Sequence, residues 1–359
     1  MTLEEFGFNT WFADQIDPEK DAGLTVARVT AVHKGECEVS DGQVSRPAKT
    51  TGRLRHHAQT KLDMPTVGDW VLVSHFENED CGRIERILER QSALKRKTSG
   101  RTVRFQLIAA NVDTAFIMQT LGPGYNLQRL ERYLVMVNES GIEPVVLLSK
   151  SDLLAPEELS GRLEEIRARM PNVQLHAFSN EDRTNLMEVM ALFRPGRTYC
   201  VIGTSGVGKT TLLNHLIGEA DYLFTLPVRE SDGKGVHTTT WRELVVLDNG
   251  ALVVDTPGMR ELGNMDVNTG IEETFDDIRL LAASCRFSDC SHVNTPGCAV
   301  LAAVERGELS SARYNNYLRL MKEAAYHEQS ALEKREQDRK LGRFYRSMQQ
   351  ISRRSKGDA

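Results

Sequence analysis

The spacing of apolar residues changes twice along the chain. Residues 23–91 contain short stretches of four to ten residues that are rich in β-branched and aromatic side chains and are separated by turn residues. This pattern predicts short β-strands. We expect five of them, at 24–33, 35–40, 52–57, 67–76 and 82–91. Five such strands fit a small barrel of the oligonucleotide/oligosaccharide-binding (OB) type, although any small barrel or sandwich would give the same pattern.

After a polar, basic linker at residues 95–105, apolar strands alternate with amphipathic helices. Strands are expected at 113–120, 144–149, 173–179, 198–203, 243–248 and 251–258. Helices are expected at 127–141, 156–170 and 209–218. This alternation is typical of a parallel or mixed sheet covered by helices. From about residue 266 the pattern is helical and is interrupted by a cluster of cysteine and histidine.

These changes predict a multidomain α/β protein. The expected parts are an N-terminal extension at 1–22, the OB-type barrel at 23–98, an α/β domain at 99–265, a helical domain at 266–333 and a basic tail at 334–359. A chain of 359 residues is long enough for two to three domains at roughly 150 residues each.

Composition and charge exclude several classes of protein. Hydrophobic residues make up 40% and charged residues 26%, no apolar run approaches the roughly 18 residues of a membrane span, and the acidic start lacks the apolar core of a secretory signal. We therefore expect a cytoplasmic protein that does not bind membranes. The net charge is −5, but basic residues gather at 95–104 and 334–356. From charge alone, a solvated helix with a frayed terminus explains the basic tail better than local binding of a polyanion does.

A phosphate-binding motif follows the strand expected at 198–203. Residues 203–210 match G-x-x-x-x-G-K-[ST] in full and lead into the next helix. The motif consists of Gly203, Thr204, Ser205, Gly206, Val207, Gly208, Lys209 and Thr210, with Thr211 directly after it. Its backbone N–H groups would surround phosphates, Lys209 would reach the β- and γ-phosphates, and Thr210 would bind Mg²⁺. A glycine turn that merely caps a helix is the alternative, but the strand–loop–helix context favours nucleotide binding.

Two further segments fit a nucleotide site. The strand at 251–258 ends in D-T-P-G, where Asp255 would complete the Mg²⁺ shell and the backbone of Gly258 would approach a γ-phosphate. The G-K-G-V-H-T-T-T segment at 233–240 holds Thr238, Thr239 and Thr240, one of which would give a hydroxyl to Mg²⁺. Taken alone, D-T-P-G could be a simple β-turn, but its place at the end of an apolar strand, 45 residues beyond Thr210, favours the functional interpretation. The 233–240 segment without its neighbours is equally well explained as an ordinary loop.

The choice of base is indicated by Ser149, Lys150, Ser151 and Asp152, which follow an apolar strand and approximate the [NT]-K-x-D motif of GTPases. A carboxylate accepts both guanine donors, whereas adenine would leave it unpaired. Asp152 would therefore recognise guanine, and the stem of Lys150 would cover the ring. Ser149 replaces the usual Asn, and its hydroxyl can do part of the bracing that Asn does. Ser179 and Asn180, after the next strand, stand where GTPases contact the guanine carbonyl.

A metal site is indicated by Cys285, Cys290, His292 and Cys298, which lie within 14 residues. Three thiolates and one imidazole make a closed tetrahedral Zn²⁺ site, which would be structural because no position remains for water. Chance clustering of buried cysteines is the alternative. Cys37, Cys81 and Cys200 fit ordinary core or surface positions.

The order of the motifs is unusual, because the base motif precedes the phosphate loop, which precedes D-T-P-G. This circularly permuted order, with a β domain before it and a Cys/His cluster after it, resembles the ribosome small-subunit-dependent GTPases of the RsgA family. The resemblance covers most of residues 23–330. It implies a GTP hydrolase that binds the 30S ribosomal subunit late in its maturation, with the barrel and the zinc region on 16S rRNA. We expect a monomer that binds GTP and GDP, with one Zn²⁺ and with Mg²⁺ accompanying GTP.

Hydrolysis by this chain is expected to be slow without a partner. Many GTPases place a glutamine after DxxG to orient the attacking water, but this chain has Met259 there. His237 is the best candidate for completing the site, and the resemblance indicates the same histidine. A lone loop histidine is as often merely solvated.

Two other functions remain compatible with these motifs. One is an ATP-dependent enzyme, such as a small-molecule kinase, which Asp152 argues against. The other is an RNA-binding module with a vestigial nucleotide site, which the intact Lys209, Thr210 and Asp255 argue against.

Overall fold

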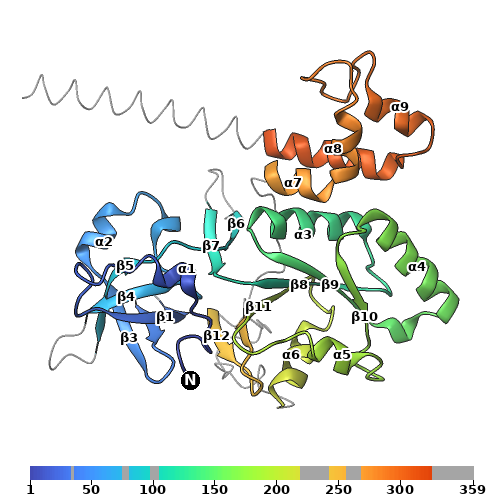
Figure 1. Ribbon diagram of the computed structural model, residues 1–359. Helices are drawn as coiled ribbons and strands as arrows, with labels where there is room; N and C mark the ends of the chain where they lie inside the picture. The colour runs from blue at the N-terminus through green and yellow to red at the C-terminus, as the bar shows by residue number, and fades with distance from the viewer. Residues whose placement is uncertain (34–35, 75–80, 98–104, 219–241, 256–267, 326–359) are drawn as a thin grey trace, which may run out of the picture.

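The computed structural model describes residues 1–33, 36–74, 81–97, 105–218, 242–255 and 268–325. Among these residues the chain forms a β-barrel, an α/β domain beside it and a small helical unit above helix α3 (Figure 1). No helix of the described part is long and apolar enough to cross a membrane.

The expected barrel is confirmed. Its strands follow one another in the order β1-β2-β3-β5-β4, and a pairing between β1 and β4 closes the ring. The strands are β1 (Thr25–Val32), β2 (Cys37–Ser40), β3 (Ser45–Thr50), β4 (Trp70–Ser74) and β5 (Gly82–Ile87). Alternate residues point inward, so Val29, Val39, Val71 and Ile84 form a buried core in which each side chain is at most 3% exposed.

The prediction of a strand at residues 52–57 is wrong. Residues 52–57 form helix α2 (Gly52–His57), because the Thr51 hydroxyl accepts a hydrogen bond from the N–H of Leu54 and caps a helix start. The missing strand is β3, which precedes α2. The sequence of β3 lacks the apolar alternation of a strand, because Pro47 lies within it and most of its side chains are exposed.

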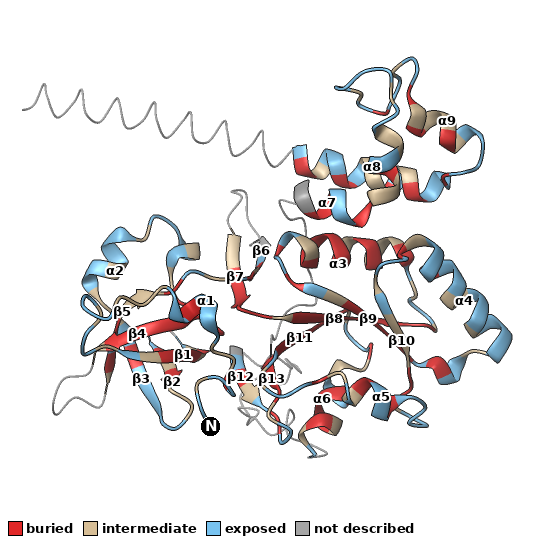
Figure 2. Ribbon diagram, in the orientation of Figure 1, coloured by how far each residue is buried: buried red, intermediate tan, exposed pale blue. Residues whose placement is uncertain are grey.

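The α/β domain has the expected mixed sheet. Five parallel strands run in the order β10-β9-β8-β11-β13, and β12 lies antiparallel beside β13. These strands are β8 (Thr114–Thr120), β9 (Glu143–Ser149), β10 (Gln174–Ala177), β11 (Thr198–Ile202), β12 (Arg242–Val246) and β13 (Leu252–Asp255). Helices α3 (Leu127–Glu139) and α4 (Pro156–Arg169) cover one face, and α5 (Leu186–Met190) and α6 (Lys209–Ile217) cover the other (Figure 1). Every residue of β8 is buried, as expected for a central strand with helices on both faces (Figure 2).

The barrel and the α/β domain share one sheet. Beyond its pairing with β4, strand β1 pairs with β12, with Ala31 opposite Glu243 and Val32 opposite Arg242. Eleven strands therefore form a single hydrogen-bonded sheet that runs from β10 through β12 into the barrel. Residues 95–97 and 105 of the expected linker belong instead to a short hairpin of β6 (Ala93–Lys97) and β7 (Phe105–Ala110).

The N-terminal segment covers this junction. Phe6 and Phe12 are 3% and 1% exposed and pack with Phe8 around Trp70, with helix α1 (Thr10–Ala13) in the same segment. The segment thus contributes to the core, a role that its acidic sequence did not predict.

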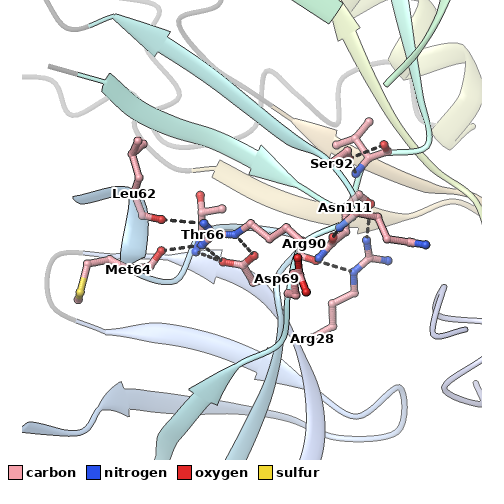
Figure 3. Close-up of polar contacts among 12 residues, drawn as sticks. Arg28, Leu62, Met64, Thr66, Asp69, Arg90, Ser92 and Asn111 are labelled. Carbon is pink, nitrogen blue, oxygen red and sulfur yellow. Dashed lines mark hydrogen bonds and ion pairs between the residues drawn. The ribbon is translucent and has the colours of Figure 1, made fainter. Parts of the chain in front are cut away.

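Two arginines lie near the junction, the buried Arg28 and the partly buried Arg90 (Figure 3). Arg28 donates to the carbonyls of Phe6, Gly68 and Asn111 and to the Thr198 hydroxyl, at 2.8 to 3.3 Å. Arg90 forms a two-pronged ion pair with Asp69 at 2.6 and 2.8 Å. Arg90 also donates to the carbonyls of Leu62 and Met64 next to the short helix η1 (Lys61–Asp63). The bonds of Arg28 link the N-terminal segment and the barrel to Asn111 and to Thr198 on β11, so they hold the barrel against the α/β domain. The bonds of Arg90 lie within the barrel region itself.

The expected helical domain packs on α3. It comprises α7 (Asn268–Thr274), α8 (Asp276–Ala282), α9 (Ala299–Glu305) and a further helix at residues 311–325. The fully buried carboxylate of Glu131 on α3 receives hydrogen bonds from Arg313 and Asn316 of the last helix. Arg313 also pairs with Asp277 at 2.6 Å, so one arginine joins α3, α8 and the last helix. A buried carboxylate paired in this way fixes where the unit sits.

Candidate nucleotide and metal sites

Three loops that carry expected site residues lie at one edge of the sheet. They follow β11, β9 and β10, which are parallel and therefore end at the same edge. In open α/β sheets this carboxyl edge is where ligands bind. Residues 203–208, 149–153 and 178–184, separated in sequence, are thus brought together.

The loop at 203–208 has the geometry of a phosphate loop. Gly203, Gly206 and Gly208 have φ angles of 155°, 76° and 98°, which side chains rarely adopt. A Cβ atom on Gly203 would lie 2.2 Å from the carbonyl oxygen of Met118, so the close approach to β8 also requires glycine. Helix α6 begins at Lys209, whose ammonium donates to the carbonyls of Gly203 and Thr204 at 2.8 and 2.7 Å. The lysine is therefore held directly over the loop, while Thr210 and Thr211 are exposed.

The base-motif loop contacts the phosphate loop directly. Ser149 is fully buried, and its hydroxyl donates to the carbonyl of Val207 at 2.7 Å. Lys150 adopts a left-handed conformation with φ of 61° and begins the short helix η2 (Ser151–Leu153). In that helix Ser151 is buried and Asp152 is exposed. This turn leaves the Asp152 carboxylate accessible at the edge of the sheet.

The loop after β10 joins both neighbours. The N–H of Ser151 donates to the carbonyl of Phe178 at 3.2 Å, and the amide of Asn180 donates to the carbonyl of Gly208 at 3.2 Å. The fully buried Ser179 hydroxyl accepts from the N–H groups of Glu181 and Asp182, which fixes the turn. Sequence reasoning placed Asn180 near the base but did not foresee its contact with the phosphate loop. No local pattern encodes that contact, because it joins the loops after β10 and β11, which β9 and β8 separate in the sheet.

The remaining nucleotide candidates are only partly covered by the structure. Asp255 is the last residue of β13, which lies beside β11, so its backbone is at the same edge as the phosphate loop. His237, Thr238, Thr239, Thr240 and Gly258 lie outside the described residues, as does Met259.

The Cys/His cluster predicted from the sequence is assembled. Ligand atoms of Cys285, Cys290, His292 and Cys298 all lie within 4.8 Å of one another. The His292 Nδ1 atom is 3.5 Å from the sulfur of Cys298 and 3.7 Å from that of Cys285. Burial lowers the pKa of His292, which favours the neutral imidazole that binds metal.

This donor set fits Zn²⁺. Three sulfurs and one ring nitrogen, brought together by a loop with few apolar residues, match the ligands of closed structural zinc sites. The four side chains would hold the ion, which would supply cross-links between α8, α9 and the loop joining them. The other cysteines differ: burial raises the pKa of Cys37 to about 11 and of Cys200 to about 12, so these two remain inert core thiols.

Comparison with known proteins agrees with this architecture. Residues 87–265 match the family model described as RsgA GTPase. The small ribosomal subunit biogenesis GTPase RsgA 2 of Vibrio vulnificus is 39% identical over 97% of this chain and 95% of its own length. The corresponding RsgA protein of Opitutus terrae is 38% identical over 91% of this chain and 90% of its own length.

Solved structures show the same fold. The crystal structure of YjeQ from Thermotoga maritima superposes with a TM-score of 0.62 at 28% identity and covers 84% of this chain and 99% of its own. The structure of YloQ, a circularly permuted GTPase, superposes with a TM-score of 0.60 at 26% identity and covers 86% of this chain and 98% of its own. With the base loop ahead of the phosphate loop and a five-stranded barrel ahead of both, this chain is a circularly permuted GTP hydrolase and belongs to the RsgA GTPase family.

Proposed function

We propose that this GTPase binds the 30S ribosomal subunit late in its maturation, and that the subunit stimulates GTP hydrolysis and thereby its own release from the protein. The observation that carries the nucleotide part is the convergence of the 149–153 and 178–184 loops on the phosphate loop. The names of relatives similar over nearly the whole chain support the ribosomal part.

Guanine would be recognised by the loop after β9. The exposed Asp152 carboxylate would accept the two donors of the guanine edge, and the stem of Lys150 would lie over the ring. Ser151, Ser179 and Asn180 would complete the base pocket. An ATP-dependent reaction is disfavoured because adenine would leave a carboxylate unpaired.

The phosphates would be held by the loop and by Lys209. Its ammonium, now on the loop's own carbonyls, would turn to the β- and γ-phosphates of GTP. Residues 203–208 would offer backbone N–H groups, and Thr204, Ser205 and Thr211 would lie beside them. Thr210 and Asp255 would hold Mg²⁺ together with one of Thr238, Thr239 and Thr240. When bound, Mg²⁺ would neutralise charge on the phosphate oxygens.

Slow turnover in the absence of the subunit follows from Met259, which cannot orient water as a glutamine does. We propose that His237 completes the site when the subunit is bound. The substitution His237→Ala is expected to lower subunit-stimulated hydrolysis and to leave GTP affinity intact. Unchanged stimulated turnover would remove His237 from the mechanism.

The 16S rRNA would be contacted by the barrel and by the zinc-binding unit of a monomer. Helix α2 exposes Arg53, Arg55, His56 and His57 on the barrel, where they would meet phosphates. Such contacts weaken as salt rises, which distinguishes them from apolar docking.

The decisive experiment measures GTP hydrolysis by the purified protein with and without purified 30S subunits, with ATP in parallel. Slow GTP turnover that the subunit raises many-fold, with ATP inert, is expected. GTP turnover that the subunit leaves unchanged would contradict the proposed partner. ATP turnover would contradict guanine selection, and subunit binding that survives Lys209→Ala with full cellular function would favour an RNA-binding module.

A further inference from the structure

Two neighbouring carbonyls of the phosphate loop are held by side chains from two different base-recognition loops. The hydroxyl of Ser149 donates to the carbonyl of Val207 at 2.7 Å. The amide of Asn180 donates to the next carbonyl, that of Gly208, at 3.2 Å. The last turn of the phosphate loop is therefore attached to both segments that would hold the base.

Ser149 can make only one of these contacts. A hydroxyl has a single O–H donor, whereas an amide has two N–H donors and a longer reach. Ser149 is fully buried, and its donor is already committed to Val207. The asparagine that is usual at this position in GTPases would bring two N–H donors to the same place. With serine, a second hydrogen bond to the phosphate-loop backbone has to come from another residue.

Asn180 is placed to supply it. A Cβ atom on Gly208 would lie 2.6 Å from the Asn180 amide nitrogen, so the side chain occupies space beside the loop backbone that is free because residue 208 is glycine. The buried turn at Ser179 fixes the backbone from which Asn180 projects. Its amide oxygen is shielded from solvent and has no hydrogen-bond partner among the described residues, so the contact to Gly208 is what holds the side chain there.

We infer that Asn180 is a positioning residue for nucleotide binding, supplying from the neighbouring loop the amide contact that Ser149 is too short to make. The contact couples the base pocket to the phosphate loop, so that both ends of a nucleotide meet a preformed site. This inference rests on the proposed use of these loops to bind GTP.

The test is the dissociation rate of fluorescent GDP and GTP analogues from the full-length protein, measured without ribosomes. Asn180→Ala removes one hydrogen bond and is expected to speed dissociation about tenfold for both nucleotides. Asn180→Asp keeps the shape but opposes a carboxylate to the Gly208 carbonyl, so a larger effect is expected.

Asn185→Gly provides the matched control. Asn185 directly follows the same loop, and its amide also donates to a backbone carbonyl, that of Ala177 at 3.0 Å, which is outside the phosphate loop. Glycine accepts the φ of 52° at this position. Dissociation within about twofold of the wild-type rate is expected for this variant. Wild-type dissociation from Asn180→Ala would overturn the inference, whereas a wild-type protein that binds no GTP would overturn the proposed function instead.

A double variant tests whether an amide at position 149 can replace the amide of Asn180. In the double variant Ser149→Asn with Asn180→Ala, the longer amide at position 149 can use the space vacated at position 180. Dissociation is expected to return to within about threefold of the wild-type rate. A folded double variant that releases nucleotide as fast as Asn180→Ala would overturn the compensation between the two positions.

Discussion

Arg28 is a buried cation whose guanidinium is satisfied by neutral groups rather than by a carboxylate. It is 1% exposed and donates to three carbonyls and one hydroxyl from four separate segments. Burial lowers its pKa to about 10, and Asp113 and Asp69 act in the opposite direction. The side chain therefore stays charged at neutral pH, and its bonds hold the N-terminal segment and the barrel to β11.

Replacing this arginine should destabilise the protein strongly. Arg28→Ala would leave buried carbonyls without donors, at about 1–3 kcal/mol for each unsatisfied group, so a loss of about 3 kcal/mol or more in the free energy of unfolding is expected. Urea-induced unfolding of the wild-type protein and the variant measures this difference in the free energy of unfolding. Arg53→Ala, on the exposed face of α2, is the matched control and should change stability by less than about 0.5 kcal/mol. Equal effects of the two substitutions would show that the junction is not held by Arg28.

At the level of elements, the packing of α7 on α3 depends on a glycine. A Cβ atom on Gly270 would lie 2.1 Å from the carbonyl oxygen of Val135 and 3.0 Å from the backbone nitrogen of Glu139. The Gly270 N–H also donates to the carboxylate of Glu139 at 2.8 Å. The two helices thus meet backbone to backbone, and even one methyl group would push them apart.

Gly270→Ala and Gly161→Ala should therefore have opposite effects. At Gly270 the methyl group forces a backbone shift, and a loss of about 1–3 kcal/mol in the free energy of unfolding is expected. At Gly161, within α4, a Cβ atom meets nothing within 4 Å, so the alanine should stabilise the protein by about 0.5–1 kcal/mol. Thermal unfolding of both variants, compared with the wild-type protein, measures these two opposite changes in stability. Stabilisation by Gly270→Ala would contradict the close approach of α7 to α3.

The elements that sequence reasoning predicted well are those whose burial pattern is local. Strands β8 and β9 are largely continuous apolar runs. In α3 the apolar residues recur with the period of a helix. In both cases the residues alone therefore predict whether the segment is a strand or a helix. Residues 52–57 were assigned to a strand because their helix depends on a capping contact from Thr51. The pairing of β1 with β12 was not foreseen, since register between distant strands has no local signal.

The same distinction holds for the site. The phosphate-loop and Cys/His motifs are compact in sequence, and the structure places their members together. The link from Asn180 to Gly208 joins residues 28 positions apart, and only the sheet order brings them into contact.

At the scale of the whole molecule, the C-terminal unit contributes few apolar residues to its Cys/His loop and should depend on metal. Cys298→Ala removes one of four ligands and also the sulfur that accepts from the N–H of Leu301 at the start of α9. The variant is expected to lose its bound zinc and to become sensitive to proteases around residues 283–298. Metal analysis should find one zinc ion per wild-type chain and one per chain of the half-buried control Cys81→Ser. Zinc retained by Cys298→Ala would rule out the four-ligand site.

The continuous sheet makes the barrel a neighbour of the nucleotide edge. Ala31 of β1 pairs with Glu243 of β12, which pairs with Asp255 at the end of β13. Adjacent strands are about 4.8 Å apart, so the barrel strand lies only about 10 Å from the proposed Mg²⁺ ligand along the ladder. Because β12 begins two residues after Thr240 in the sequence, a change at the γ-phosphate that is felt by Thr238, Thr239 or Thr240 has a short hydrogen-bonded route to the barrel.

Hydrogen exchange tests that route. Replacing GDP by a non-hydrolysable GTP analogue is expected to slow amide exchange in β12 and in Ala31 and Val32 of β1, since ordering one strand restrains its hydrogen-bonded neighbour. Strand β3 pairs with β2 and β5 on the other side of the barrel and should exchange at an unchanged rate. A change in amide exchange confined to β12 would show that the nucleotide state is not transmitted to the barrel. A response that reaches β1 requires, by linkage, that whatever binds the barrel and restrains β1 also changes the affinity for GTP relative to GDP.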